Sequence, residues 1–194
     1  VVIVVVAPVV VRAPVIVPGV IVPVIVVRAF PYLYDGDVDY ERRYLEVYRE
    51  SARAVLVGAF DGDRLVGAAT GTPMADHAED FAAAFEGTGI DLSTLFYCAE
   101  SVLLPEYRGR GVGHSFFDLR EAHARRLGYA RACFRGVLRP ADHPLRPADY
   151  APLDPFWRKR GYAPLPGVVA HFRWKDIDQA EETEKPLQFW MREL

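Results

Sequence analysis

Two runs of mainly apolar residues, 54–60 and 64–71, flank the turn tripeptide Asp61-Gly62-Asp63. That arrangement predicts a β-hairpin. A third run, 96–104, is apolar except around Glu100 and ends at Pro105, as expected of a buried strand. Similar apolar segments predict three more strands, at 130–137, 168–174 and 187–194.

Helical periodicity appears between these strands. At 100° per residue, one face of the segment after Gly111 collects seven residues: Gly113, Phe116, Phe117, Arg120, His123, Ala124 and Leu127. The segment 155–162 predicts a short helix that ends at Gly161, and 75–94 is a helical or irregular insertion. Upstream, Tyr40, Tyr44 and Tyr48 recur every fourth residue, which predicts a packed helix face. The order of elements predicts a mixed α/β sheet in a single domain, 1–194.

The first 28 residues differ in composition from the rest of the chain. They contain only Val, Ile, Pro, Ala, Gly and Arg. Proline interrupts them too often for a membrane helix, which needs about 20 consecutive apolar residues. Their β-branched residues predict strands, which the prolines restrict to sheet edges or short pieces. No function is assigned to this segment.

Composition excludes several classes of protein. The chain has 194 residues, 51% hydrophobic and 25% charged, with a net charge of −3. That charge gives no general attraction to nucleic acid or to acidic membranes. Two cysteines are too few for a disulfide scaffold and lack the spacing of metal ligands. We therefore expect a cytoplasmic protein with reduced thiols, no metal, no nucleic-acid partner and no membrane partner.

The stretch 107–117, "YRGRGVGHSFF", carries the clearest chemistry. A strand, a glycine-rich turn and a helix start together can hold phosphate, because unpaired N–H groups point at the anion with the helix dipole behind them. The turn lacks the lysine and Ser/Thr of a mononucleotide loop, and its glycine spacing is not that of the dinucleotide fingerprint. The alternative is a flexible turn that binds nothing.

The segment 102–113, "VLLPEYRGRGVG", resembles motif A of the GNAT superfamily of acyl-CoA-dependent N-acyltransferases. The resemblance continues through "RRLGYARACF" and "PFWRKRGY" and follows the order of elements over about 30–194. It implies a mostly antiparallel sheet, splayed at a central parallel strand pair and flanked by helices. It also implies acetyl-CoA as co-substrate and an amine of a small molecule or peptide as acceptor, and it leaves a homodimer open. The alternative is a non-catalytic acyl-CoA-binding module.

The resemblance also implies which residues contact coenzyme A. Backbone N–H groups of the turn and helix start would hold the pyrophosphate, the strand edge would pair with the pantetheine arm, and two aromatic residues would flank the thioester. The residues for the pyrophosphate are Arg108, Gly109, Arg110, Gly111, Val112, Gly113 and His114. Those for the pantetheine arm are Val102, Leu103 and Leu104, and those for the thioester end are Phe156 and Trp157.

Acyl transfer needs a base for the attacking ammonium and benefits from an acid for the departing thiolate. Glu100, the only charged residue in its run, is the candidate base, with a structural ion pair as the alternative. Many family members use a tyrosine of the short helix as the acid, but Trp157 stands at that position here. Tyr150, Tyr162 or a water molecule are the alternatives for this acid, and we select Tyr150.

Two further groups of polar residues are of interest. Arg120 and His123 interrupt the apolar helix face, which indicates a polar network under the sheet with Glu100 as a candidate partner; such residues are more often satisfied core groups. On the acceptor side, Tyr32, Tyr34 and Asp35 lie where the family's first helices line the acceptor site, and aromatic faces with carboxylates suit a cationic amine. His143, in a proline-rich loop, is the remaining candidate for substrate binding.

Overall fold

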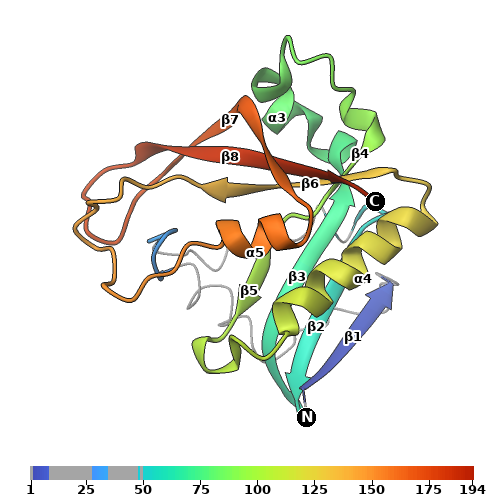
Figure 1. Ribbon diagram of the computed structural model, residues 1–194, viewed down its shortest axis with the longest axis horizontal. Helices are drawn as coiled ribbons and strands as arrows, with labels where there is room; N and C mark the ends of the chain where they lie inside the picture. The colour runs from blue at the N-terminus through green and yellow to red at the C-terminus, as the bar shows by residue number, and fades with distance from the viewer. Residues whose placement is uncertain (1, 9–27, 35–47, 49) are drawn as a thin grey trace.

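A computed structural model describes residues 2–8, 28–34, 48 and 50–194. The predictions that fall on Asp35, Tyr40 and Tyr44 lie outside these residues. The protein folds around one twisted sheet whose strands run in the order β1-β2-β3-β4-β6-β8-β7, with β5 paired to β3 (Figure 1). The strands are β1 (Val2–Pro8), β2 (Val55–Asp61), β3 (Arg64–Pro73), β4 (Leu95–Tyr97), β5 (Ser101–Leu103), β6 (Arg131–Val137), β7 (Ala163–Trp174) and β8 (Thr183–Glu193).

All pairings of neighbouring strands are antiparallel except β4 with β6. The fold class predicted from the sequence, a mostly antiparallel sheet with one parallel pair, is therefore confirmed. β1 confirms the strand expected at the N-terminus, and it occupies a sheet edge, where Pro8 removes no ladder hydrogen bond from a central strand.

The predicted strand 96–104 is wrong in one respect, because it is two strands. β4 ends at Tyr97 and β5 begins at Ser101, so residues 98–100 interrupt the strand. Periodicity could not show this break, since apolar residues lie on both sides of it. The C-terminal strands β7 and β8 are also longer than predicted, starting at 163 and 183 rather than 168 and 187.

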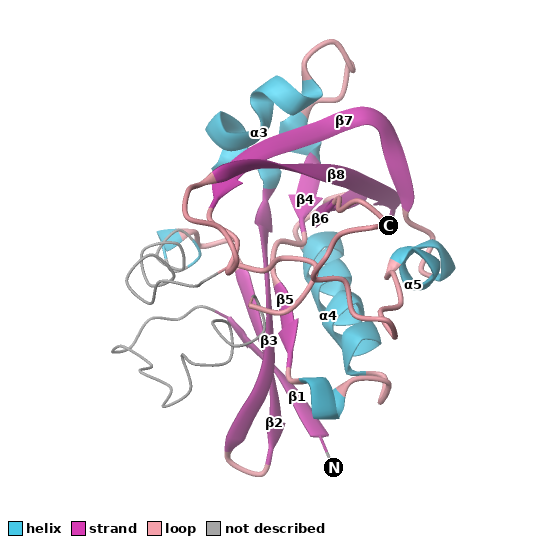
Figure 2. Ribbon diagram, turned by 90° about the vertical axis from the view of Figure 1, so that its left-hand side faces the viewer, coloured by secondary structure: helices cyan, strands magenta, loops and turns pink. Residues whose placement is uncertain are grey.

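The two faces of the sheet bury separate apolar clusters. α4 (Val112–Arg126) packs Phe116, Phe117 and Ala124 on one face, and α5 (Asp154–Lys159) lies on the same face. The predicted insertion contains the short turns η1 (Met74–His77) and η2 (Leu92–Thr94) and the helix α3 (Ala78–Phe85). α3 covers the other face through Phe81 and Phe85 (Figure 2). None of the helices that the structure describes is long and apolar enough to cross a membrane.

Candidate active site

The break between β4 and β5 opens the sheet at its centre. β4 pairs with β6 from Leu95↔Arg131 to Tyr97↔Cys133, and Cys98 N–H donates to Cys133 O at 2.8 Å. After that point β5 stays with β3, while β6 continues with β8 (Figure 1). Among the described residues no strand pairs with the β6-facing edge of β5. The backbone of Val102 and Leu103 therefore borders an opening in the sheet.

Beyond β5, a short turn and the start of α4 adjoin this opening. Leu104 N–H donates to Val66 O at 3.0 Å, and η3 (Pro105–Tyr107) leads into the exposed turn. Gly109 and Gly111 have φ of 72° and 84°, conformations that residues with a Cβ rarely adopt. Gly111 is the N-cap of α4, so the N–H groups of the next three residues, Val112, Gly113 and His114, have no partner within the helix.

The turn is exposed and basic. Arg108 and Arg110 are both exposed; Arg108 Nε lies 3.4 Å from Leu103 O, and the guanidinium of Arg110 lies 5.2 Å from the centre of the Tyr107 ring. Tyr107 is itself held by a 2.8 Å hydrogen bond from its hydroxyl to Asp61. An anion could approach this turn from solvent without displacing the core.

The aromatic residues of α5 lie in two different environments. Phe156 contacts the first turn of α4, with its ring centre 4.8 Å from that of His114. Trp157 packs inward against Phe134 and Trp190, and its ring lies over Gly136, where a Cβ would come within 2.8 Å of the indole. The indole of Trp157 thus packs against β6.

Tyr162, the other substitute considered for the acid, is 2% exposed. Its hydroxyl donates to Glu121 Oε1 at 3.1 Å, and Arg160 and Arg192 contact the same carboxylate at 3.1 and 3.4 Å. Burial and the nearby Cys98 and Glu121 raise the pKa of Tyr162. This cluster joins α4, α5 and β8 and uses Tyr162 as a structural hydrogen-bond donor.

On the α3 face, ionisable residues gather around the break. Glu100 is half-buried. Burial and the charge of Glu100 raise the pKa of Tyr32, and burial raises the pKa of Tyr97 to about 12. Tyr97 accepts a 2.7 Å hydrogen bond from Arg135 Nε. The guanidinium of Arg135 also packs on the Phe172 ring, 4.4 Å from its centre.

Tyr150 belongs to the same region, because it packs on Phe30, two residues before Tyr32 in the chain. Its ring meets that of Phe30 edge-on at 4.7 Å, and Phe30 also contacts His143 at 5.6 Å. The structure thus brings the predicted residues Tyr32, Glu100 and Tyr150 into one neighbourhood.

A buried ionic cluster attaches segment 28–34 to the sheet. Asp176 accepts two hydrogen bonds from Arg139, at 2.7 and 2.9 Å, and Lys185 lies 3.5 Å away. Arg139 in turn donates to Pro31 O at 2.7 Å and Tyr32 O at 2.8 Å. Tyr34 forms an isolated bridge with Asp176.

Sequence reasoning missed four residues of this site. Thr70, whose Oγ1 accepts from Glu100 N–H at 3.1 Å, gave no signal, and neither did Tyr97 or Asp176, because their partners are distant along the chain. Arg135 did give one: it is a charged residue inside the apolar strand "ARACFRGV". Arg120 and His123 were noticed, but they differ in environment. Arg120 is buried under the break, whereas His123 lies at the helix rim, 2.9 Å from Arg53 O.

Both cysteines, Cys98 and Cys133, are free and buried, and burial raises the pKa of each thiol. Within the described part of the chain, no group of three or more His, Cys, Asp or Glu side chains could hold a metal ion.

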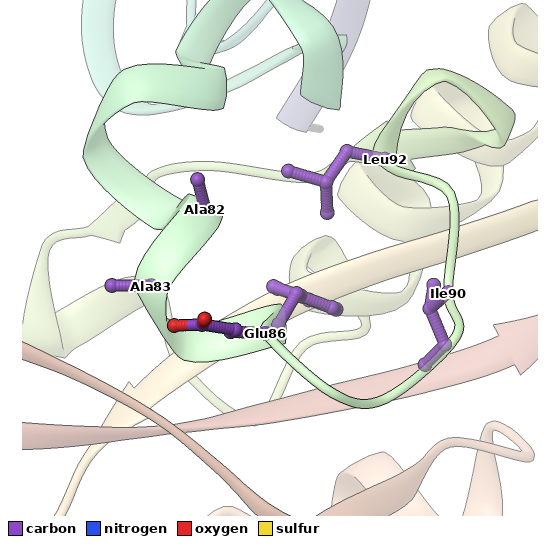
Figure 3. A pocket seen from close by; sticks show the side chains of 6 residues that line it. Ala82, Ala83, Glu86, Ile90 and Leu92 are labelled. Carbon is purple, nitrogen blue, oxygen red and sulfur yellow. The ribbon is translucent and has the colours of Figure 1, made fainter.

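A shallow hollow of about 500 Å³ lies beside α3, away from all the predicted site residues (Figure 3). It is lined by Ala82, Ala83, Phe85, Glu86, Ile90 and Leu92. The surface of this hollow is mainly apolar, and Glu86 is the one ionisable residue among those that line it.

Comparisons with known proteins agree with this architecture. The family model for the Acetyltransferase (GNAT) family matches residues 25–145. Curated protein sequences contain no significant match. Solved structures with the same fold include a GCN5-related N-acetyltransferase from Kribbella flavida, with 15% identity, 98% coverage of each chain and a TM-score of 0.60.

Two further solved structures with the same fold come from other organisms. A ribosomal-protein-alanine N-acetyltransferase from Brucella melitensis has 15% identity, coverage of 90% of this chain and 91% of that one, and a TM-score of 0.56. A polyamine N-acetyltransferase from Drosophila melanogaster has 14% identity, coverage of 98% and 100%, and a TM-score of 0.54. These likenesses concern the fold, and the family model spans more than half of the chain. The chain belongs to the GNAT family of acetyltransferases.

Proposed function

We propose that this protein transfers the acetyl group of acetyl-CoA to an amine of a small molecule or peptide, by direct attack within a ternary complex. One observation carries the proposal. The unpaired edge of β5, the turn at 108–111 and the carboxylate-bearing break at Glu100 follow one another along a single stretch of chain.

In this proposal the coenzyme lies along that stretch. The N–H groups from Gly109 to His114 hold the pyrophosphate, and Arg108 and Arg110 add positive charge. The free edge of β5, Val102 and Leu103, with Leu104 following it, pairs with the pantetheine amides as a further strand would. Phe156 borders the pyrophosphate turn, and Trp157 forms the wall towards β6. When bound, acetyl-CoA supplies an activated acetyl group as a thioester.

Glu100 acts as the base in this scheme. The acceptor is mostly an ammonium ion at neutral pH, so it must lose a proton before its nitrogen can form the new C–N bond. Glu100 takes that proton, directly or through water. Tyr32 and Tyr97 lie close enough to Glu100 for its charge to contribute to their raised pKa values.

Tyr150 serves as the acid for the departing sulfur. Burial raises its pKa from the usual value, so the phenol stays protonated at neutral pH. A normal tyrosine, at about 10, is already about 1.5 pKa units, or about 2 kcal/mol, above a thiol of about 8.5. Tyr150 therefore assists by hydrogen bonding to the developing thiolate, and complete protonation follows from solvent.

Direct attack is favoured over an acyl-enzyme route. An acyl-cysteine would require an accessible thiolate, yet the chain has two cysteines and both are buried with raised pKa values. The amine nitrogen thus attacks the thioester carbonyl, the C–S bond breaks, and coenzyme A leaves as the thiol.

The acceptor site is assigned to the α3 face of the break. Tyr32, Tyr34, Asp35 and His143 remain its proposed residues, with Tyr97 and Arg135 as additions from the geometry. The fold neighbours include a polyamine N-acetyltransferase and a ribosomal-protein-alanine N-acetyltransferase, which accords with an acceptor that is either a small or a peptide amine.

A thermal-shift titration followed by a thiol-release assay tests the proposal. Acetyl-CoA at 100 times its Kd should add about 2.7 kcal/mol of stability. Desulfo-coenzyme A, which keeps the phosphates but cannot donate acetyl, should give a comparable shift and no thiol. No shift at millimolar coenzyme contradicts the proposal. A shift without thiol release from any amine of a broad panel favours the non-catalytic acyl-CoA-binding module instead.

A further inference from the structure

Arg120 is a fully buried cation among apolar residues of one face of α4. Its exposure is 0%, and its neighbours on the α4 face include Phe116, Phe117 and Ala124. The guanidinium lies 4.7 Å from the centre of the Phe117 ring. Burying a charge is costly, so a cation at this position needs an explanation.

The guanidinium donates to the strand break. Arg120 Nη1 donates to Thr70 O at 3.1 Å and to Glu100 O at 3.0 Å, and Nε donates to Phe116 O at 3.1 Å. One nitrogen thus joins the carbonyl of β3 to the carbonyl of the break. The sequence predicted a network reaching Glu100, and Arg120 does reach that residue, at its main chain.

Thr70 completes the attachment from the β3 side. Its N–H donates to Glu100 O at 3.0 Å, and its carbonyl accepts from Ala99 N–H at 3.0 Å. Its side chain accepts from Glu100 N–H at 3.1 Å through Oγ1. Both main-chain groups of Glu100 are therefore bonded to Thr70, and its carbonyl is bonded to Arg120 as well.

Stability alone does not account for Arg120. Without the guanidinium, Thr70 O keeps its bond from Ala99 and Glu100 O keeps its bond from Thr70, so neither carbonyl loses its last partner. Nη2 has no hydrogen-bond acceptor among the described residues. Replacing such a buried charge by an apolar side chain of similar length is often neutral for folding.

We propose that Arg120, assisted by the Thr70 hydroxyl, is a positioning residue that fixes the break between β4 and β5. By holding the carbonyls of Thr70 and Glu100 together, it keeps β5 on β3 and away from β6, and it sets the direction of the Glu100 carboxylate. The opening receives the pantetheine arm, so the catalytic part of this inference rests on the proposed function.

Arg120→Met and Arg120→Lys test the role of the guanidinium N–H donors. Methionine and lysine are similar in length, but of these two only lysine donates hydrogen bonds. The Met variant should melt within about 4 °C of the parent, which corresponds to about 1 kcal/mol. Its acetyl-CoA affinity should fall about tenfold, the value of one or two lost hydrogen bonds, and its kcat should fall as well. The Lys variant should recover most of the affinity. Ala124→Gly, a buried change in α4 that removes no hydrogen-bond donor, is the control and should leave affinity unchanged.

Thr70→Val and Thr70→Ser separate the effect on the proposed base, Glu100, from the effect on coenzyme binding in the opening beside β5. Valine removes the acceptor for Glu100 N–H, so kcat should fall about tenfold while the KM for acetyl-CoA stays within about twofold. The acidic limb of the pH–rate profile, where the base becomes protonated and inactive, should move with it. Serine keeps the hydroxyl and should restore kcat.

Amide hydrogen exchange decides the inference independently of catalysis. The Ala99 and Glu100 amides should exchange about tenfold faster or more in Arg120→Met and at parental rates in Ala124→Gly. Unchanged exchange in Arg120→Met, or equal loss of coenzyme affinity in the Met, Lys and Gly variants, overturns the positioning role. A parent that releases no thiol with any amine refutes the proposed function, while the exchange rates still decide whether Arg120 holds the break.

Discussion

At the scale of single residues, Glu100 is placed so that its chemistry can be separated from its structural role. Its main chain is bonded to Thr70 and Arg120, whereas its carboxylate influences Tyr32 and Tyr97. Glu100→Gln keeps the shape and those main-chain bonds but removes the basicity. The rate should fall roughly 10²–10⁴-fold, the usual contribution of a positioned base, and steady-state kinetics with a saturating amine measures the loss.

The pH dependence of Glu100→Gln provides the control. As pH rises, more of the amine is already deprotonated, so the defect should shrink, while coenzyme affinity stays near the parental value. A structural ion pair would give the opposite result, with a lower melting temperature and a normal rate per folded molecule. A stable Gln variant with full activity would remove Glu100 from the mechanism.

At the scale of one element, the start of α4 contains two glycines with different constraints. Gly111 has φ of 84°, so Gly111→Ala should destabilise the free protein by about 1–2 kcal/mol through backbone strain. Gly113 lies within the helix, and an added Cβ would meet Phe156 at an ordinary 3.6 Å. Gly113→Ala should therefore leave the free protein as stable or up to about 1 kcal/mol more stable. Both variants should nevertheless bind acetyl-CoA more weakly, because a methyl group intrudes where the main chain approaches phosphate.

Calorimetric titration of Gly111→Ala and Gly113→Ala with acetyl-CoA measures their loss of affinity relative to the parent. Arg108→Ala is the companion variant: its loss of affinity should shrink at high salt, because the charge is exposed and screened. Parental affinity in all three variants would mean that the turn does not hold the pyrophosphate.

At the scale of the whole molecule, Asp176 connects segments that are far apart in the chain. It neutralises Arg139 and Lys185, which are themselves buried, and Arg139 holds segment 28–34 through Pro31 O and Tyr32 O. Asp176→Asn would leave two buried cations without their carboxylate. The free energy of unfolding should fall by about 3–5 kcal/mol, as measured by denaturant unfolding.

Asp178→Asn is the matched control, because Asp178 is exposed and only two residues away. It should change stability by less than about 0.5 kcal/mol. The folded fraction of Asp176→Asn should also turn over more slowly, since Arg139, which donates to Tyr32 O, loses its carboxylate partner. Equal stability of the two variants would show that the ionic cluster does not hold the loop.

Local patterns in the sequence determined most of the elements and the family. The hairpin, the amphipathic face of α4 and the motif "VLLPEYRGRGVG" involve residues close together in the chain, so spacing and turn chemistry suffice to identify them. The order of elements then indicated the mixed sheet, and the fold and the family match agree with it. The residues assigned to coenzyme, acceptor and catalysis stay predictions.

Only the tertiary structure decided where the strand breaks and what surrounds Glu100. The segment 96–104 is apolar on both sides of the break, so its pattern is the same for one strand or two. The break depends on Thr70, 30 residues away, and on Arg120, whose acceptors are main-chain carbonyls that any residue type could supply. The cluster of Arg139, Asp176 and Lys185 likewise joins three distant segments. Side-chain periodicity reports which face is buried, whereas partners across the sheet are set by how the chain returns on itself.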